Sequence, residues 1–335
     1  MRWTSQLAGA FEALSAGGFG VIDAGARDGL VRVLGGVAPV LRVVGFEPDA
    51  EEAARLQAEA DARNGFRSIQ FLPVALGREA GEQSLNLCRS GGSSSFLQPN
   101  RAFLDRFPDA QRCDVLRTVS VPVRSLDALR LDPAGGLPAP VDFIKLDTQG
   151  SELNILQGAE ALLRREVVGL EVEVLFAPLY QSQVVFRDID AWLASQGFIL
   201  FKLRRQEWVR RSFDRQPHLS GGQLVFGDAL YLRDPLASQG GWVPQDARQA
   251  QALVLLAMLY DLHDYATELV TAPQLARFFP HAPAMAACVR RHSRRLGSWR
   301  ERLRVLRARC VKGDGFRRYA RAWSRGDGNF YSVLK

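Results

Sequence analysis

Residues 21–29 read VIDAGARDG, an apolar run that leads into a turn with two glycines. Glycine has no Cβ, so the backbone there can turn tightly and approach a bound ligand closely. The next apolar run, at 41–46, is followed by Glu47, which comes 22 residues after Gly25. That spacing is near the ~20 residues expected for a carboxylate that holds ribose hydroxyls. The two signals together predict a nucleotide-binding strand–turn–helix unit; the alternative is a tight turn followed by an exposed glutamate.

The order of residues in the turn separates two classes of nucleotide. Dinucleotide-binding folds use GxGxxG, which brings a helix N-terminus to the pyrophosphate. Here Asp23 precedes the first glycine and the spacing is DxGxxxG. A carboxylate at this position repels a pyrophosphate but attracts an ammonium group. S-adenosylmethionine carries an ammonium group, a sulfonium and no phosphate, so the sequence favours it over NAD and disfavours an NAD-linked oxidoreductase.

Apolar runs alternate with helical patterns between about residues 19 and 234. Strands are expected at 20–23, 41–46, 69–74, 142–146, 167–174, 198–203 and 224–232, and helices at 50–62, 152–164 and 185–195. This alternation predicts an α/β fold with a Rossmann-like, mainly parallel sheet covered by helices. The segment 77–140 is long for a connection between strands, so we expect a partly ordered insert over the site.

Length and charge predict two parts. A chain of 335 residues fits one α/β domain plus an appendage. The strand pattern stops after Pro235, which predicts a catalytic domain at 1–235 and a basic, mostly helical domain at 236–335. The last hundred residues hold 17 Lys/Arg and 7 Asp/Glu, a net charge of +10, whereas the remainder carries −3. Two differently charged parts indicate two surfaces with different tasks.

Two kinds of site and one location are disfavoured by the sequence. The four cysteines form no CxxC pair, which disfavours a structural zinc site and a disulfide framework. No stretch approaches the ~20 apolar residues of a membrane span. The first twenty residues lack the continuous apolar segment of a signal peptide. We therefore expect a cytoplasmic protein with reduced thiols.

A second group of acids occurs in the stretch 141–152, VDFIKLDTQGSE. The apolar run delivers Asp147 to the C-terminal tip of a strand, where ligands collect in open α/β sheets. Glu152 falls in the first turn of the next helix, where a capping role and a functional role both stay open. Glu171 and Glu173 follow at alternate positions of the next strand and share one face. We favour Glu173 as the functional residue because it lies nearer the tip.

The chain resembles the FkbM-type methyltransferases. The matching pieces are VIDAGARDG, VVGFEPD, FLPVALG, SGGSSSFLQP, SVPVRSLDAL, DFIKLDTQGSELNILQGAE, GLEVEVLFAPLYQSQ and DIDAWLASQGFILFKL, in the family's order between about residues 19 and 203. The resemblance implies a seven-stranded sheet of the class I methyltransferase type, here with a C-terminal helical extension that the resemblance does not cover. It also implies transfer of a methyl group from S-adenosylmethionine to a hydroxyl of a sugar, a glycolipid or glycan, or a natural product.

The resemblance also implies roles for individual residues. Those at cofactor-binding positions of the matched pieces are Asp23, Gly25, Ala26, Gly29, Glu47, Pro48, Ala75, Leu76 and Ser94. Asp147 and Glu152 match the family's second acidic block. Arg27 departs from the family's frequent DxGAN pattern, and Gln149 stands where many members have Glu. The second departure weakens any proposal of a metal ion at this block.

The expected chemistry needs a base. A sulfonium methyl is already activated, so the protein must align an acceptor oxygen behind it at about 3–3.5 Å and exclude water. An alcohol reacts only as its proton moves to a base. Asp147 is the preferred base, with Glu173 and His218 as alternates; His218 precedes the last strand and is otherwise a solvent-exposed loop residue. A divalent ion at Asp147, Glu171 or Glu173 suits carboxylate oxygens, but we do not favour it.

The C-terminal part has its own pattern. Residues 252–260 are apolar nearly all round, which predicts a buried helix packed on the catalytic domain or on a second subunit of a homo-oligomer. Residues 290–325 are rich in Arg, which indicates a solvated basic face or contact with a polyanion. For the polyanion we favour an anionic lipid surface or lipid-linked glycan at the inner face of a membrane; nucleic acid is disfavoured because no binding motif occurs.

Three further expectations concern histidines, serines and the function as a whole. His263, His281 and His292 lie in the helical part, and we expect structural or surface roles for them. The serines at 93–95 belong either to a flexible connector or to the binding site. A non-catalytic nucleotide-binding scaffold stays open as an alternative function.

Overall fold

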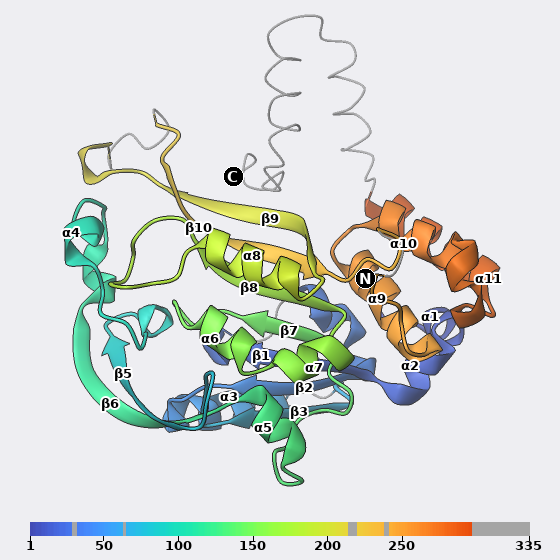
Figure 1. The fold of residues 1–335 in the computed structure, drawn as a ribbon, viewed down its shortest axis with the longest axis horizontal. Helices are drawn as coiled ribbons and strands as arrows, with labels where there is room; N and C mark the ends of the chain where they lie inside the picture. Colours follow the sequence, from blue (N-terminus) through green and yellow to red (C-terminus); the bar gives the residue numbers. More distant parts are fainter. Residues whose placement is uncertain (29–31, 63–64, 214–219, 238–240, 297–335) are drawn as a thin grey trace, which may run out of the picture.

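The computed structural model describes residues 1–28, 32–62, 65–213, 220–237 and 241–296, and its centre is a seven-stranded sheet (Figure 1). The strands, in their order across the sheet, are β3 (Ser68–Leu72), β2 (Leu41–Phe46), β1 (Phe19–Ala24), β7 (Phe143–Leu146), β8 (Gly169–Leu175), β10 (Gln223–Leu232) and β9 (Ile199–Trp208). All neighbours from β3 to β8 pair in parallel, and β10 runs antiparallel to both β8 and β9. The predicted Rossmann-like, mainly parallel sheet is confirmed.

Helices cover both faces of this sheet, which explains why its central strands are continuous apolar runs. One face packs against α5 (Leu126–Leu131), α6 (Glu152–Gln157), α7 (Glu160–Arg165) and α8 (Phe186–Ser195). The other packs against α1 (Ser5–Ala10), α2 (Glu12–Gly17), α9 (Ala247–Leu259), α10 (His263–Thr271) and α11 (Ala282–Leu296). The helix α3 (Ala50–Ala62) follows β2 and contacts β3, and α4 is the short helix Arg101–Leu104. Shorter 3₁₀ helices are Ala26–Asp28, Arg32–Val40, Gly91–Ser93, Ala110–Cys113, Arg211–Phe213 and Pro273–Phe278.

The segment 77–140 is more ordered than we predicted. It contributes β5 (Gly81–Cys88) and β6 (Val115–Arg124), which join β4 (Ala75–Leu76) in a second, three-stranded sheet of order β4–β6–β5. A small core of Ala75, Leu85, Val121 and Val123 holds this sheet together. The first half of β5 is exposed, so its sequence lacks the long apolar alternation by which a strand is predicted.

One predicted helix is divided in two. The pattern predicted a helix over 152–164, whereas α6 ends at Gln157 and α7 starts at Glu160. A Cβ at Gly158 would overlap the carbonyl oxygen of Gly77. The close approach of two glycine backbones therefore fixes the place of the break.

The helix predicted from the apolar run at 252–260 is α9, and it packs on the catalytic sheet. Its residues from Gln249 to Leu259 are buried in the same cluster as Phe19 and Val21 of β1. The side chain of Gln251 accepts a hydrogen bond from the backbone N–H of Leu14 at 3.0 Å. This confirms the first of the two packing alternatives.

Three predictions concern positions that the structure does not describe. Gly29, His218 and residues 297–335 lie outside the described residues, so the predicted basic surface at 290–325 stays a prediction. Within the described part of the chain, every helix is too short or too polar to cross a membrane.

Candidate active site

A cavity of about 740 Å³, open to solvent, lies at the carboxyl ends of β1, β2 and β7. Six of the predicted cofactor-binding residues line it: Gly25, Glu47, Pro48, Ala75, Leu76 and Ser94. Apolar side chains supply much of the remaining wall, namely Phe46, Val74, Leu85, Leu87 and Phe96. A largely apolar wall with a few polar groups is typical of a small-molecule site.

Gly25 makes the closest turn at this cavity. Its φ is +77°, a region that residues with a Cβ rarely adopt. A Cβ at this position would also overlap the carbonyl oxygen of Asp147. The turns after β1 and β7 are therefore packed backbone to backbone, and only glycine fits between them. The neighbouring Ala26 is buried and is not part of the cavity wall.

Glu47 forms the polar side of the cavity at the tip of β2. Its carboxylate accepts a hydrogen bond from the backbone N–H of Asp49 at 3.1 Å. Burial raises the pKa of Glu47, although this N–H and the nearby charge of Arg27 act in the opposite direction. The group thus remains a buried acceptor at the cavity edge.

Arg27 connects the two sides of the cavity mouth. Its guanidinium lies 3.3 Å from Asp49 Oδ2 and 3.7 Å from Glu52 Oε1. The same guanidinium packs so close to Gly91 that a Cβ there would overlap it. From the sequence, Arg27 was noted only as a departure from the family pattern; its place in the cavity wall was not predicted.

Asp23, a predicted cofactor residue, is buried behind the cavity wall, and its cofactor role stays a prediction. Its carboxylate is only 1% exposed and is not part of the cavity wall. Oδ1 accepts a hydrogen bond from Lys145 Nζ at 3.2 Å, and the buried Oδ2 has no hydrogen-bond partner among the described residues. Burial outweighs the attraction of Lys145 and raises the pKa of Asp23 to about 6. Lys145 also lies 3.8 Å from Asp147, so Asp23 is connected to the cavity wall through this lysine.

A second cavity, of about 990 Å³, adjoins the first. Its wall is rich in polar side chains: Arg112, Asp147, Gln149, Glu173, Tyr180, Arg204, Gln206 and Asp228. Both cavities are lined by Gly92, Asp147 and Gln149. The two spaces therefore meet at the turn after β7, where Asp147 is exposed to both.

Gln149 joins the polar groups at this meeting point. Its amide nitrogen donates to Asp147 Oδ1 at 3.0 Å and to Glu173 Oε2 at 2.6 Å. Its side-chain oxygen lies 2.9 Å from the hydroxyl of Tyr180, and its backbone oxygen accepts from Ser95 Oγ at 2.7 Å. The backbone φ is +57°, a strained value for a residue with a Cβ. These contacts hold the strained turn in place.

The two acids of β8 have different surroundings. Glu173 lines the second cavity although it is only 7% exposed, and burial first, then the charges of Asp147 and Glu152, raise its pKa. Glu171 instead accepts a hydrogen bond from the Tyr260 hydroxyl at 2.7 Å and lines neither cavity. The structure thus places Glu173, and not Glu171, beside Asp147.

Glu152 accepts hydrogen bonds from the turn that follows β7. Its carboxylate accepts from the backbone N–H groups of Thr148 and Gly150, at 2.8 and 2.9 Å, and from the Thr148 hydroxyl at 3.0 Å. It is buried and is absent from both cavity walls. The sequence left a capping role and a functional role open for Glu152. Its contacts are those of a residue that stabilises the turn before α6.

Residues 23–200, more than half of the chain, match the model of the methyltransferase FkbM domain. The chain belongs to the FkbM methyltransferase family. No curated protein matches it significantly. The chain matches a solved FkbM methyltransferase from Methylobacillus flagellatus with 18% identity and a TM-score of 0.37, over 64% of this chain and 43% of that one. It thus spans less than half the length of that relative.

Two further solved structures show weaker similarity. Magnesium protoporphyrin IX methyltransferase from Synechocystis, solved with bound SAM, has 12% identity and a TM-score of 0.31, over 68% of this chain and 80% of that one. The StiE O-MT segment has 12% identity and a TM-score of 0.33, over 77% of this chain and 79% of that one.

The candidate site also differs from the sequence expectations in its acids and in two further side chains. Among the described residues, Asp147, Glu171 and Glu173 do not form a group of ligand atoms close enough to hold a metal ion. The sequence argument also missed Tyr180 and Arg204, which line the second cavity. Tyr180 lies in GLEVEVLFAPLYQSQ, a piece that the resemblance had already marked; Arg204 lies on an edge strand beyond it and carried no signal.

Proposed function

We propose that this methyltransferase transfers a methyl group from S-adenosylmethionine to a hydroxyl of a sugar, a glycolipid or glycan, or a natural-product acceptor. We assign the reaction to residues 1–235. The observation that carries the proposal is the meeting of two cavities of different character at Asp147 and Gln149. A donor and an acceptor bound in adjoining spaces can bring their reacting atoms together at one point.

The first cavity fits the donor by its chemistry. Glu47 offers carboxylate oxygens that can accept two hydrogen bonds from a ribose cis-diol, and the apolar wall suits a nucleobase. Arg27 is the basic side chain in the wall, and its charge is matched by Asp49 and Glu52. A ligand without phosphate therefore suits this cavity better than a dinucleotide. When bound, S-adenosylmethionine supplies an activated methyl group.

The second cavity fits an acceptor with several hydroxyls. Arg204 donates to Asp228 at 2.8 Å, and both side chains line the cavity near Tyr180. Donors and acceptors of this kind hydrogen-bond hydroxyl groups readily. We propose that Asp147, which lines both cavities, accepts the proton of the reacting hydroxyl. Gln149 keeps that carboxylate in place through its amide N–H.

Glu173 and His218 remain the alternate bases. Glu173 lies on the acceptor side alone, and its raised pKa favours the protonated form more than that of an ordinary glutamate. His218 lies outside the described residues. Asp147 is preferred because it is the acid in contact with both spaces.

Ligand-dependent stability and product detection test the proposal. S-adenosylhomocysteine should raise the Tm of the protein and NADH should not, because only the former lacks a pyrophosphate. Incubation with S-adenosylmethionine and a panel of sugars, glycolipids and polyketide alcohols should give a product heavier by one methyl group. Stabilisation by NADH alone would overturn the donor. Donor binding with methylation only of amines or carboxylates would overturn the acceptor class, and donor binding without any product would favour a scaffold.

We also propose that residues 290–325 bring the enzyme to an anionic surface at the inner face of a membrane. The net charge of +10 on residues 236–335 supports this, since each basic residue near an anionic surface contributes ~1 kcal/mol and salt screens the attraction. The full chain should co-sediment with anionic vesicles at low salt and less at high salt. Equal binding to neutral vesicles would contradict the proposal.

A further inference from the structure

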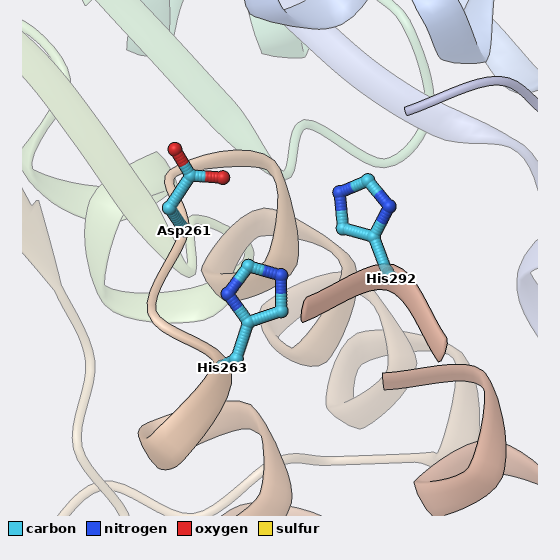
Figure 2. Close-up of side chains that lie close together, drawn as sticks. All are labelled: Asp261, His263 and His292. Atoms are coloured by element: carbon cyan, nitrogen blue, oxygen red, sulfur yellow. The ribbon is translucent and has the colours of Figure 1, made fainter. Parts of the chain in front are cut away.

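Three side chains of metal-binding type meet where α11 passes the turn between α9 and α10. Asp261, His263 and His292 each offer one ligand atom, and these atoms lie within 4.8 Å of one another. The two imidazole rings are 5.2 Å apart and tilted by 30°. Figure 2 shows the carboxylate and the two rings gathered around one space.

The turn that places two of these residues follows from the end of α9. The helix ends at Leu259, and the backbone N–H of Leu262 bonds back to the oxygen of Ala257 at 2.8 Å. Asp261 takes a left-handed φ of +61°, which ends a helix in this way and which Asp tolerates better than most residues. The helix α10 then begins at His263. The turn therefore brings a carboxylate and an imidazole to the side that α11 approaches.

A second observation points to a ligand. The Nε2 atom of His263 is buried and has no hydrogen-bond partner among the described residues. A buried polar atom left in this way destabilises the fold, and such atoms are uncommon in native proteins unless an ion or a water satisfies them. A neutral imidazole nitrogen is also a preferred ligand of divalent metals.

We propose that Asp261, His263 and His292 bind a Zn²⁺ ion, with water as the fourth ligand. Two imidazoles and one carboxylate are a ligand set that suits zinc, whereas Mg²⁺ and Ca²⁺ prefer oxygen alone. Zinc binds such atoms at ~2.0–2.2 Å in a tetrahedral arrangement, with ligand atoms ~3.4 Å apart, so the three side chains need to draw together by up to ~1.4 Å, a change within the reach of side-chain rotation. Asp261 is exposed, which gives water access to the fourth position. The missing CxxC pairs argue against cysteine sites and do not bear on this one.

The ion ties α11 to the turn that follows Tyr260. Tyr260 donates to Glu171 in the sheet, and its backbone oxygen accepts from Lys202. None of the three ligands lines either cavity of the candidate active site. The metal therefore stabilises the helical part and takes no part in methyl transfer.

Zinc titration of the full chain, freed of metal by a chelator, tests the site. With Zn²⁺ alone as the probe, we expect one ion bound per chain and a higher Tm, since a ligand that binds the native state stabilises it. Mg²⁺ should leave the Tm unchanged. His263→Ala and His292→Ala should each weaken zinc binding ~10-fold or more, because each removes one of three protein ligands.

His281→Ala is the matched control, since His281 lies in the same helical part, is exposed and is outside the cluster. It should bind zinc as the unchanged chain does. The milder change Asp261→Asn keeps the shape of the turn and should also weaken binding, should either His variant fail to fold. Absence of stoichiometric zinc, or equal affinity of the His263, His292 and His281 variants, would overturn the site.

Discussion

The strand β7 carries an aspartate at each end, and the two differ in every contact. Asp142, which precedes the strand, is 0% exposed; both of its oxygens accept from Arg248, at 2.8 and 2.9 Å, and one also accepts from the Gly20 N–H. Asp147, which follows the strand, has a side chain 30% exposed and faces two cavities. One residue type thus occupies a buried, charge-paired position before the strand and a position that faces the candidate active site after it.

The difference lies in how the charge is matched. Asp142 has a guanidinium in direct contact, and burial still raises its pKa to about 6. Asp147 lies 3.8 Å from Lys145 and shares the Gln149 amide with a second acid, Glu173. Like charges held together beside a cavity are costly and are typical of sites that bind or react.

Left-handed backbone conformations also gather at the Asp147 end. Gly150 and Gly25 have φ of +107° and +77°, which glycine adopts without strain. Gln149 has φ of +57°, and a residue with a Cβ keeps such a value only where the surrounding contacts fix it. The comparison therefore predicts that changes at Asp147 affect turnover and changes at Asp142 affect folding.

The largest effect on turnover is expected at Asp147, which follows β7. Asp147→Asn should lower kcat by ~10²–10⁴, the usual contribution of a general base, because Asn cannot accept the acceptor's proton. The Tm should change little, since the side chain is partly exposed and Asn can still accept from Gln149. Methyl-transfer rates with the true acceptor measure this. Near-normal turnover would remove Asp147 from the mechanism.

Changes at Asp142 and its partner Arg248 should instead lower the free energy of unfolding. Arg248→Leu leaves the Asp142 carboxylate buried without its cation, which costs ~3–5 kcal/mol. Urea unfolding measures the loss, and the folded protein should keep its kcat. The double variant Asp142→Leu, Arg248→Leu should recover much of the stability, because a buried pair can be replaced by apolar groups at little cost.

The pH dependence of stability gives a further check on the ion pair between Asp142 and Arg248. Asp142 has a pKa of about 6 in the folded protein against 3.8 ordinarily, so its contribution to stability is fully present below about pH 4 and is lost as the pH rises through 6. Without Arg248 the pKa rises further. The deficit of Arg248→Leu should therefore shrink on acidification toward pH 4; a deficit independent of pH would contradict the assignment.

A smaller effect is expected at the wall of the first cavity. Glu47→Ala should weaken binding of S-adenosylhomocysteine by ~1–3 kcal/mol, the value of hydrogen bonds to a charged acceptor. Calorimetry measures the affinity. Glu51→Ala is the matched control, since Glu51 is exposed at the start of α3 and is not part of the cavity wall. Equal affinities for both variants would exclude Glu47 from donor binding.

The sequence predicts the elements whose apolar residues follow a regular local pattern. It misses the residues whose conformation and role depend on contacts with distant parts of the chain. The strand at 41–46 and the helix at 50–62 match their predicted bounds, because apolar runs and helical periodicity are local signals. Asp147 and Glu173 were predicted as acids at strand tips, and both line the second cavity. Gln149 is missed because its importance depends on a positive φ and on contacts with Ser95, Tyr180 and Glu173.

Asp23 shows that a motif gives a residue type and not its surroundings. The resemblance marked it as a cofactor residue; in the structure its carboxylate pairs with Lys145 and is not part of the cavity wall, and its cofactor role stays a prediction. In the second sheet, β6 carries alternating Val119, Val121 and Val123, a local signal that was missed. Half of β5 is exposed and lacks such a signal.

The smallest effect concerns the two acids that share Gln149. The base must be deprotonated to act, and the pKa of Glu173 is raised well above that of an ordinary glutamate. Because interacting carboxyls titrate as a pair, the acid limb of kcat/KM should report the two acids together, with activity lost as the pH falls through it. Glu173→Gln removes one member of the pair and its negative charge, so the limb should move to lower pH.

At a pH one unit below the wild-type midpoint, this shift should be worth up to about tenfold in relative kcat/KM. Glu171→Gln is the control, because Glu171 lies on the same strand and face but bonds to Tyr260 and lines neither cavity. Its limb should stay in place. If both variants shift the limb equally, the effect is one of general charge; if Glu173→Gln leaves it unmoved, the two acids at the meeting point do not titrate together, and Asp147 acts without its neighbour.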